Sequence, residues 1–433
     1  MTDDVRVIRA DRSQLQWDLL DLEALLPHDH RARVVWQFVE NLDLEALYSA
    51  VKSRQGGAGR PAADPKVLLA LWLYATVDGV GSARELARLV ERDVAYRWLA
   101  GGVPVNYHGL SDFRVDHMVE LDRLLTDSVM ALIAEGLVSL KEIAVDGTKV
   151  RAHASRGSFK TADKLAAIEA AVKARLSALK DEIETDSAAS SRRKQAAAKR
   201  AAEEVAARSR RAHKALEQIR SEKEKRKKRH AADEAKKREP KASLSDPEAR
   251  NMKFADGAIH AGYNAQIAAT SDGLIIAIDM TDRRNDAGLA IPMVDEIMHR
   301  YGQAPETLLV DTRYATTKDI ATLATREQGA VTVFTPLPTE RDDVKPDTKY
   351  RRDRARAREP AAVKEWRRRM TEPAGQEIYS RRQRIELVNA HCKSRGLGRL
   401  NVRGLLKAKA VALWHALAHN LLTAHRLRAR AVA

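Results

Sequence analysis

The chain has 433 residues, a formal net charge of +16 and a pI of about 9.8. This length allows two or three domains with sizeable cores, and the positive charge favours an anionic partner, nucleic acid before an acidic membrane. The single cysteine, Cys392, excludes an intramolecular disulfide and a cysteine-rich zinc site. Because no apolar run reaches the roughly 18 to 20 residues of a membrane helix and the N-terminus lacks an apolar signal region, we expect a soluble cytosolic protein.

The positive charge is concentrated in two stretches. Residues 191–240 contain 19 Lys and Arg against 8 Asp and Glu, and residues 340–385 contain 15 against 9. The remainder of the chain is close to neutral. Local basicity of this kind suits a binding surface better than general solubility.

Residues 1–136 are predicted to form a helical N-terminal domain. Apolar residues recur at helical spacing in 29–42 and 64–79, where Asp64 is suited to cap the helix and Pro65 to occupy its first position. Residues 81–102 indicate two helices joined by a short turn. This pattern fits a helix-turn-helix reader of DNA, and it equally fits an ordinary helical hairpin in a bundle.

From residue 137 the pattern changes to strands. The stretch "EIAVDGTKVRAH" at 142–153 predicts a hairpin that turns at Asp146-Gly147, and 262–280 predicts a second hairpin that turns at Asp272-Gly273. Next follow a helix capped by Asn285 or Asp286, a short strand "ETLLVD", a helix at 316–329 and a strand "AVTVFTP". Together with the helical last hundred residues, this order predicts an α+β (α/β) domain over 137–160 and 241–433.

Residues 161–240 interrupt this domain. One apolar stripe follows a long predicted helix and consists of Leu165, Ile168, Val172, Leu176, Leu179 and Ile183. The segment "TDSAASS" can reverse the chain, after which Ala-, Lys- and Arg-rich sequence carries only a thin stripe. We expect a long basic helical hairpin inserted into the domain; the alternative is a partly disordered, solvated arm.

Three acidic residues stand out. Asp146 and Asp311 each end a predicted apolar strand, although Asp146 also fits a simple turn residue. Glu386 lies in the basic stretch "IYSRRQRIELVNAHCK". If this stretch is one helix, Tyr379, Arg382, Glu386 and Lys393 share an arc of about 60°, beside an apolar stripe of Ile378, Ile385 and Cys392.

A carboxylate grouped with a phenol, a guanidinium and an ammonium suits a site that holds a cation and a phosphate together. Two Mg²⁺ ions held by carboxylates can activate the nucleophile and stabilise the leaving oxygen in phosphodiester cleavage. Nearby Lys and Arg then neutralise the remaining phosphate charge.

These residues resemble a known family. The spacing Tyr379-x2-Arg382-x3-Glu386-x6-Lys393 is similar to the Y-R-E-K signature of bacterial insertion-sequence transposases of the DDE type. The segments "AVDGTKVRA" and "PETLLVDTRYAT" resemble the strands that carry the first and second catalytic Asp. The resemblance extends to "SDPEARNMK", "GYNAQ", "GLGRLNVRGLLKAKAVALWHALAHNLL" and the N-terminal helical region, and so covers nearly the whole chain outside 161–240.

The resemblance implies an RNase H-like catalytic core in which Asp146, Asp311 and Glu386 hold two Mg²⁺ (or Mn²⁺) ions. Arg382 and Lys393 would clamp phosphates, and Tyr379 would contact the DNA backbone or an unstacked base. Arg313, where many relatives have a small residue, would contact DNA or crowd the metals.

The implied substrates are double-stranded terminal-repeat and target DNA, bound by a homodimer in the bacterial cytoplasm at the nucleoid. The alternatives are a catalytically inactive DNA-binding descendant and a basic RNA-binding scaffold.

Two other features have simpler interpretations. His415 and His419 are four residues apart on a predicted helix, as in some zinc sites, but apolar neighbours and the lack of an HExxH glutamate favour an ordinary helix face. Trp366 could stack on a flipped base, although packing in the core is the better expectation.

Overall fold

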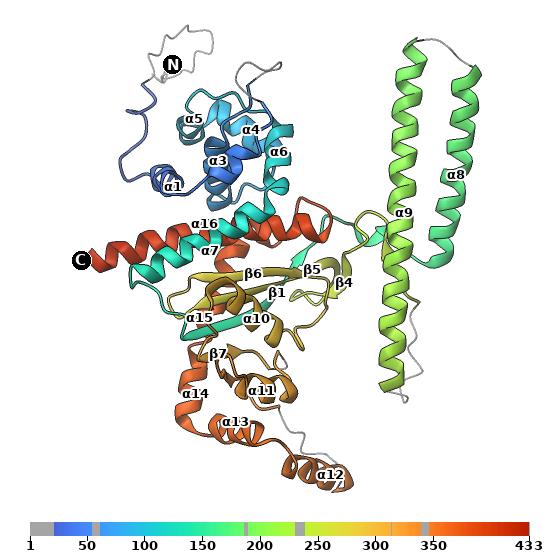
Figure 1. The fold of residues 1–433 in the computed structure, drawn as a ribbon. Coiled ribbons are helices and arrows are strands. Elements are labelled where there is room, and N and C mark those ends of the chain that lie inside the picture. Colours follow the sequence, from blue (N-terminus) through green and yellow to red (C-terminus); the bar gives the residue numbers. More distant parts are fainter. Residues whose placement is uncertain are drawn as a thin grey trace, which may run out of the picture.

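The computed structural model describes residues 21–53, 61–185, 189–229, 239–312, 314–338 and 346–432. Its N-terminal part is a group of helices (Figure 1). They are α1 (Arg31–Glu40), α2 (Glu45–Ser49), α3 (Pro65–Val77), α4 (Ala83–Arg92), α5 (Val94–Ala100), α6 (Tyr107–Asp116) and α7 (Met118–Ala134). α3 is buried along nearly its whole length, as its apolar sequence predicts.

The predicted start of α3 is confirmed, because the Asp64 carboxylate accepts a hydrogen bond from the Lys66 amide at 2.8 Å and Pro65 begins the helix. α4 and α5 are separated by Asp93 alone, whose side chain caps α5. This link is shorter than the three- to four-residue turn of a helix-turn-helix motif. Tyr96 of α5 packs edge-on against Tyr74 of α3, so the pair forms part of the bundle core.

The central sheet mixes antiparallel and parallel strands in the order β4-β5-β1-β7-β8, with β6 also paired to β5. The strands are β1 (Glu142–Arg151), β4 (Arg250–Lys253), β5 (Ile259–Thr270), β6 (Ile275–Thr281), β7 (Thr307–Val310) and β8 (Thr332–Phe334). β1 is antiparallel to β5 and parallel to β7, and β7 is parallel to β8. The chain therefore has the mixed α+β architecture that the strand and helix pattern predicts.

The hairpin predicted at Asp146-Gly147 is wrong. Residues 142–151 form one continuous strand, and Asp146 and Gly147 pair in register with Ile267 and Gln266 of β5. The second hairpin is confirmed: β5 and β6 are joined at Gly273, whose φ of 82° is the left-handed conformation that glycine favours.

The helices that follow the strands begin where the pattern predicts, with one exception. α11 (Thr317–Ala324) has a complete capping box between Thr316 and Asp319. α10 (Ala290–Tyr301) begins after Leu289 without a side-chain cap, so neither Asn285 nor Asp286 caps it. The Asp286 carboxylate instead accepts hydrogen bonds from two side chains of β5.

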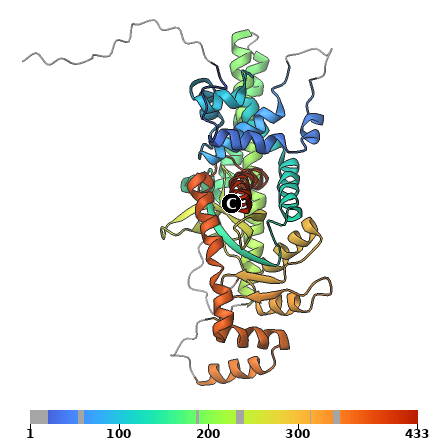
Figure 2. The same cartoon turned by 90° about the vertical axis from the view of Figure 1, so that its left-hand side faces the viewer.

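A helical hairpin projects from the sheet between β1 and β4 (Figures 1 and 2). It consists of α8 (Ala162–Thr185) and α9 (Ala189–Arg229), which pack against each other. At its base the short strands β2 (Phe159–Lys160) and β3 (Ala242–Ser243) pair antiparallel. A separate small core holds the base together and contains Leu165, Ala212, Ala215, Leu216, Ile219 and Ala242.

The C-terminal part returns to helix. It comprises α12 (Pro346–Ala357), α13 (Ala361–Thr371), α14 (Pro373–Ser380), α15 (Gln383–Cys392), the π-helical turn Lys393–Leu397 and α16 (Leu405–Val432). The single helix predicted over 378–393 is wrong, because Arg381 and Arg382 separate α14 from α15 and Lys393 lies beyond α15. The apolar stripe was predicted well: Ile385 and Cys392 are buried, and α15 packs on β1 and β5.

α16 runs between the N-terminal helices and the sheet (Figure 1) and contacts α3, α7 and β6. It contributes Trp414, Leu417 and Leu421 to the main core. Within the described ranges, no helix is both long enough and apolar enough to cross a membrane.

Candidate active site

Asp146 and Asp311 occupy matching positions along two neighbouring parallel strands. Val145 of β1 is in register with Val310, the last residue of β7, and an aspartate follows each of them: Asp146 within β1 and Asp311 directly after β7. Neighbouring strands are about 4.8 Å apart, and residues in register on adjacent strands present their side chains to the same face. The fold therefore brings together two acidic residues that are far apart in the sequence.

The Asp146 carboxylate faces the segment that joins α14 to α15 and the first turns of α15. Its Oδ1 accepts a hydrogen bond from Arg382 Nη2 at 3.1 Å, and its Oδ2 accepts one from Asn389 Nδ2 at 2.8 Å. Burial raises the pKa of Asp146 to about 6; the Arg382 charge opposes this rise, and the charges of Asp286 and Asp311 add to it. Burial therefore disfavours the ionised carboxylate more than the Arg382 charge favours it.

Arg382 links Asp146 to Glu386. Its Nη1 donates to Glu386 Oε1 at 2.7 Å while its Nη2 donates to Asp146, and its side chain is almost fully buried. Although burial acts against its charge, the pKa of Arg382 is raised, first by Asp146 and also by Asp311 and Glu386. Arg382 thus forms ion pairs with Asp146 and Glu386 and also interacts electrostatically with Asp311. The Glu386 side chain is 60% exposed and is held on this side of α15 by the ion pair.

Asp286 is a fourth carboxylate at the site, and sequence reasoning assigned it only a capping role. Its Oδ1 accepts hydrogen bonds from Asn264 Nδ2 at 2.7 Å and from Gln266 Nε2 at 2.8 Å. A Cβ atom on Gly147 would lie 1.9 Å from the same oxygen. Gly147 therefore makes room for Asp286 beside β1, which is the physical reason for a glycine after Asp146.

Two polar side chains that the sequence did not single out support this arrangement. Tyr314, three residues after Asp311, is buried and donates from its hydroxyl to Gln266 Oε1 at 2.6 Å. Asn389 occupies the position three residues after Glu386, on the same side of α15. The alternation of polar residues in "GYNAQ" and the spacing Glu386-x2-Asn389 were the available signals.

The other predicted residues differ in where they lie. Tyr379 is half-buried near the acids: burial raises its pKa, Arg382 opposes the rise, and Asp311, Glu386 and Asp146 add to it. Lys393 is exposed at the start of the π-helical turn, and none of the described acids forms an ion pair with it. Arg313 lies outside the described residues.

Comparison with known families gives the decisive observation. The family model described as the transposase DDE domain matches residues 139–421, about two thirds of the chain. The chain belongs to the DDE transposase family. A second model, described as a transposase domain, matches residues 20–116. No curated protein and no solved structure matches the chain. The protein is a transposase, an enzyme that cleaves and transposes the DNA of an insertion sequence.

Transposases of this family use divalent metal ions, and the donor set at the site fits such ions. Asp146, Asp311, Asp286 and Glu386 supply hard carboxylate oxygens, which Mg²⁺ prefers. The pKa of Asp146 is raised first by burial and then by the neighbouring charges of Asp286 and Asp311, and a bound cation would favour its ionised form. In the described part of the chain, no three acidic, histidine or cysteine side chains are already arranged as a metal cage, and the Arg382 guanidinium lies between Asp146 and Glu386.

The simpler interpretations preferred for the two histidines and Trp366, an ordinary helix face and core packing, hold in the transposase structure. His419 Nε2 donates to the Gly273 carbonyl at 2.8 Å, and His415 is buried beside it on α16, so the pair lies in a packed helix face. Trp366 is buried and its Nε1 donates to the Thr335 carbonyl at 3.0 Å. Trp366 is therefore a core residue and is not available to stack on a base.

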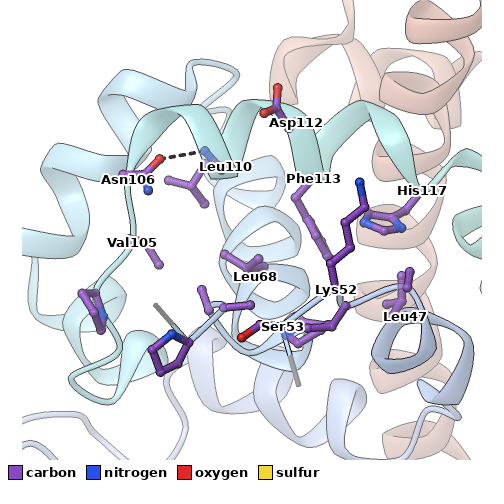
Figure 3. Close-up of a pocket in the computed structure, with 18 residues that line it drawn as sticks. Leu47, Lys52, Ser53, Leu68, Val105, Asn106, Leu110, Asp112, Phe113 and His117 are labelled. Carbon is purple, nitrogen blue, oxygen red and sulfur yellow. Dashed lines mark hydrogen bonds between the residues drawn. The ribbon is translucent and has the colours of Figure 1, made fainter. Parts of the chain in front are cut away.

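A pocket of about 810 Å³ lies within the N-terminal helices of the transposase and is separate from the carboxylates (Figure 3). Mostly apolar side chains line it, among them Leu47, Leu68, Val105 and Phe113, with Lys52 and His117 at one side. Since no acidic residue of the candidate active site contributes to it, the pocket plays no part in the catalytic arrangement.

Proposed function

We propose that Asp146, Asp311 and Glu386 form the metal-binding triad of this transposase and that the cofactor is a pair of Mg²⁺ ions, which Mn²⁺ can replace. The observation that carries the proposal is the register of β1 and β7, which sets Asp146 beside Asp311 at the point where α15 delivers Glu386. An RNase H-like core is part of the proposal. Its support is the strand order, in which β1, β5 and β6 form an antiparallel meander and β7 and β8 run parallel to β1.

The proposed reaction proceeds in two steps without a covalent protein intermediate. Water hydrolyses one strand at the element end, and the freed 3′-hydroxyl then attacks a phosphodiester of the target. When bound, the two ions would activate the attacking oxygen and stabilise the leaving oxygen. The carboxylates of Asp146 and Asp311 would hold both ions between them, and Glu386 would complete one of the two sites.

Under this proposal, Arg382 binds carboxylates before DNA binds and a DNA phosphate afterwards. In the structure, its guanidinium pairs with both Asp146 and Glu386 and so holds the two carboxylates together. A DNA phosphate is a better match for a guanidinium than one carboxylate oxygen of a largely exposed Glu386, because it accepts two parallel hydrogen bonds. Substrate binding would therefore draw Arg382 towards the phosphate and release Glu386 to serve as a ligand.

The proposed partners are the double-stranded terminal repeats of the element and the target DNA, bound by a homodimer. Tyr379, Lys393 and Arg313 would contact DNA beside the cut. The basic hairpin α8–α9 projects from the core and would contact the DNA backbone or a second subunit. Because its substrate is the bacterial chromosome, we place the enzyme in the cytoplasm at the nucleoid.

The test separates chemistry from binding. Asp146→Asn, Asp311→Asn and Glu386→Gln keep the side-chain shape but remove a charge that the ions need. Each should reduce the rate of Mg²⁺-dependent nicking of the element ends by about 100-fold or more. DNA affinity should survive or rise in gel-shift assays, because repulsion of phosphate falls. The matched control is Glu377→Gln, which makes the same change at an exposed position of α14.

Two further variants complete this experiment. Lys393→Ala should reduce nicking only partially, since it removes one phosphate contact and leaves the carboxylates in place. Arg382→Ala should be more damaging than Lys393→Ala, because it also leaves Asp146 and Glu386 without their shared cation. If Glu386→Gln nicks DNA as well as Glu377→Gln does, Glu386 is a solvated charge and the triad is wrong.

A further inference from the structure

A second pocket, of about 250 Å³, lies where the N-terminal helices meet the segment after α15. The loop between α3 and α4, with Gly79 and Gly81, forms one side together with Arg114 of α6. Arg395, Arg399 and Asn401 form the other side. Trp72, Trp414 and His415 line it from α3 and α16.

The pocket contains three arginines and, among the described residues that line it, no acidic one. Arg114 is only 7% exposed; its guanidinium donates to the Gly81 carbonyl and stacks 4.8 Å from the Trp72 ring centre. Burial lowers the pKa of Arg114 to about 10 and also lowers that of Arg395. A buried cation without a carboxylate partner is costly, so this charge calls for an anion.

Unpartnered polar atoms point to the same conclusion. Arg114 Nε and His415 Nδ1 are buried, and neither has a hydrogen-bond partner. A buried nitrogen in this state costs stability unless a ligand or water accepts or donates there. The Asn401 side chain donates to the Gly81 carbonyl at 3.1 Å and so fixes the opposite wall.

The walls of the pocket are held close by glycine backbone. Gly79 and Gly396 adopt φ values of 77° and 104°, and a Cβ on Gly396 would lie 3.5 Å from the Gly79 carbonyl oxygen. Side chains at these positions would be strained by the positive φ, and the two backbones approach to van der Waals contact. The pocket is thus a preformed, positively charged concavity of limited size, which suits a tetrahedral anion.

The pocket is also connected to the catalytic strand. Leu400 N donates to the Arg151 carbonyl at 2.8 Å, and Arg151 N donates to the Gly398 carbonyl at 3.0 Å. Residues 398–400, which follow Arg395 and include Arg399, therefore pair with the last residue of β1, the strand that carries Asp146. An anion in the pocket would touch both the N-terminal helices and the segment that pairs with the end of β1.

We propose that this pocket binds one phosphate of the substrate DNA backbone, through Arg114, Arg395 and Arg399, and so couples the N-terminal helices to the catalytic core. The proposal rests on DNA being the substrate of this transposase. The guanidinium group of an arginine matches a pair of phosphodiester oxygens, and the volume of about 250 Å³ is enough for one phosphate group. A free phosphate ion has the same chemistry, so the experiment has an arm for each source.

The first arm tests DNA with element-end duplexes in which single phosphates are replaced, one at a time, by neutral methylphosphonates. Gel shifts without divalent ions compare the parent with Arg399→Gln, which changes an exposed residue and should fold normally. Arg395→Gln is the second variant, and Arg430→Gln, exposed near the end of α16, is the matched control. Arg399→Gln should weaken binding of unmodified DNA about 5- to 20-fold and reduce the log–log salt slope by about 1.

The decisive result is that the effects of the arginine substitution and of the methylphosphonate do not add at one phosphate of the duplex. One methylphosphonate should weaken binding by the parent and by Arg430→Gln, yet have no further effect on Arg399→Gln or Arg395→Gln, because the contact is already lost. If every methylphosphonate weakens all four proteins equally, no single phosphate occupies the pocket and the proposal is wrong.

The second arm tests the free ion. Thermal unfolding is measured in sodium phosphate and in sodium chloride of equal ionic strength. Stabilisation of the parent but not of Arg399→Gln by phosphate, together with additive methylphosphonate effects, would assign the pocket to a free anion and overturn the DNA assignment. Nicking of the same ends in Mg²⁺ reports separately whether the enzyme is active.

Discussion

At the residue scale, Gly147 shows how one position serves the active site without chemistry of its own. It follows Asp146 in a continuous strand, where its φ is not in the left-handed region and no turn requires it. What requires glycine is the Asp286 carboxylate, which occupies the space of a Cβ atom. Asp286 in turn accepts hydrogen bonds from Asn264 and Gln266, so the glycine allows a whole polar group to sit beside Asp146.

We therefore expect Gly147→Ala to displace Asp286. The added methyl group overlaps a carboxylate oxygen, and overpacking of this kind destabilises a protein by about 1–3 kcal/mol. Urea unfolding should show this loss, and nicking should fall more than tenfold. In the double variant Gly147→Ala/Asp286→Ala the overlap with the carboxylate is gone and only the flexible Gln266 amide, 2.7 Å from the added carbon, must still shift, so stability should recover in part. A single variant as stable as the parent would contradict the close approach of Gly147 and Asp286.

At the element scale, the helical hairpin is joined to the sheet domain through a narrow, paired base. The antiparallel pair β2–β3 closes its base, with Lys160 in register with Ala242. The hairpin has a small core of its own, separate from the main one. Its described helices α8 and α9 fit the predicted insertion, and the basic sequence from residue 191 onward favours contact with a polyanion.

The register of β2 and β3 shows where the hairpin can be deleted without breaking their pairing. Replacing residues 161–241 by Asn-Gly should join Lys160 to Ala242 through a two-residue turn and leave the sheet folded. Because cations are lost, the affinity for DNA should fall less steeply with salt than in the parent. The measurement is a gel-shift series in rising NaCl, with circular dichroism as the folding control. An unchanged salt slope would mean that the hairpin does not contact DNA.

At the scale of the whole molecule, α16 joins the N-terminal helices to the sheet, and its packing makes stability depend on pH. Burial lowers the pKa of His415 to about 3 and that of His419 to about 4; Arg395 and Arg114 add to the effect at His415. Because these folded-state values lie below the ordinary 6.5, the unfolded chain binds more protons in mild acid. The stabilisation that these two histidines give in their neutral form is therefore present above pH 6.5, and it is lost as the pH falls towards their pKa values in the folded protein.

Each histidine should reduce the free energy of unfolding by up to about 1.4 kcal/mol per pH unit below 6.5. The comparison is urea unfolding at pH 7 and pH 5 for the parent, His415→Leu and His425→Leu, the last an exposed control on the same helix. His415→Leu should lose about 2 kcal/mol less than the parent over this interval. Equal losses in all three proteins would show that His415 does not resist protonation in the folded state.

Local sequence determined most of the elements. The cap at Asp64, the capping box at Thr316, the turn at Gly273 and the apolar stripe of Ile385 and Cys392 depend on neighbours within a few residues, and each was readable from spacing. The family resemblance, carried by motifs of the same short range, indicates the transposase function without reference to the fold. Cys392, the basic segments and the acids Asp146, Asp311 and Glu386 were likewise visible in the sequence.

Only the tertiary structure decided how these parts meet. The Asp146-Gly147 pair has the local signature of a turn, but pairing with both β5 and β7 keeps it extended. Asp286 has the signature of a cap, but its partners come from β5. The register of β1 with β7, the two ion pairs of Arg382 and the arginine pocket depend on contacts between residues far apart in the chain. Such contacts are set by the packing of whole elements, which no short window of sequence contains.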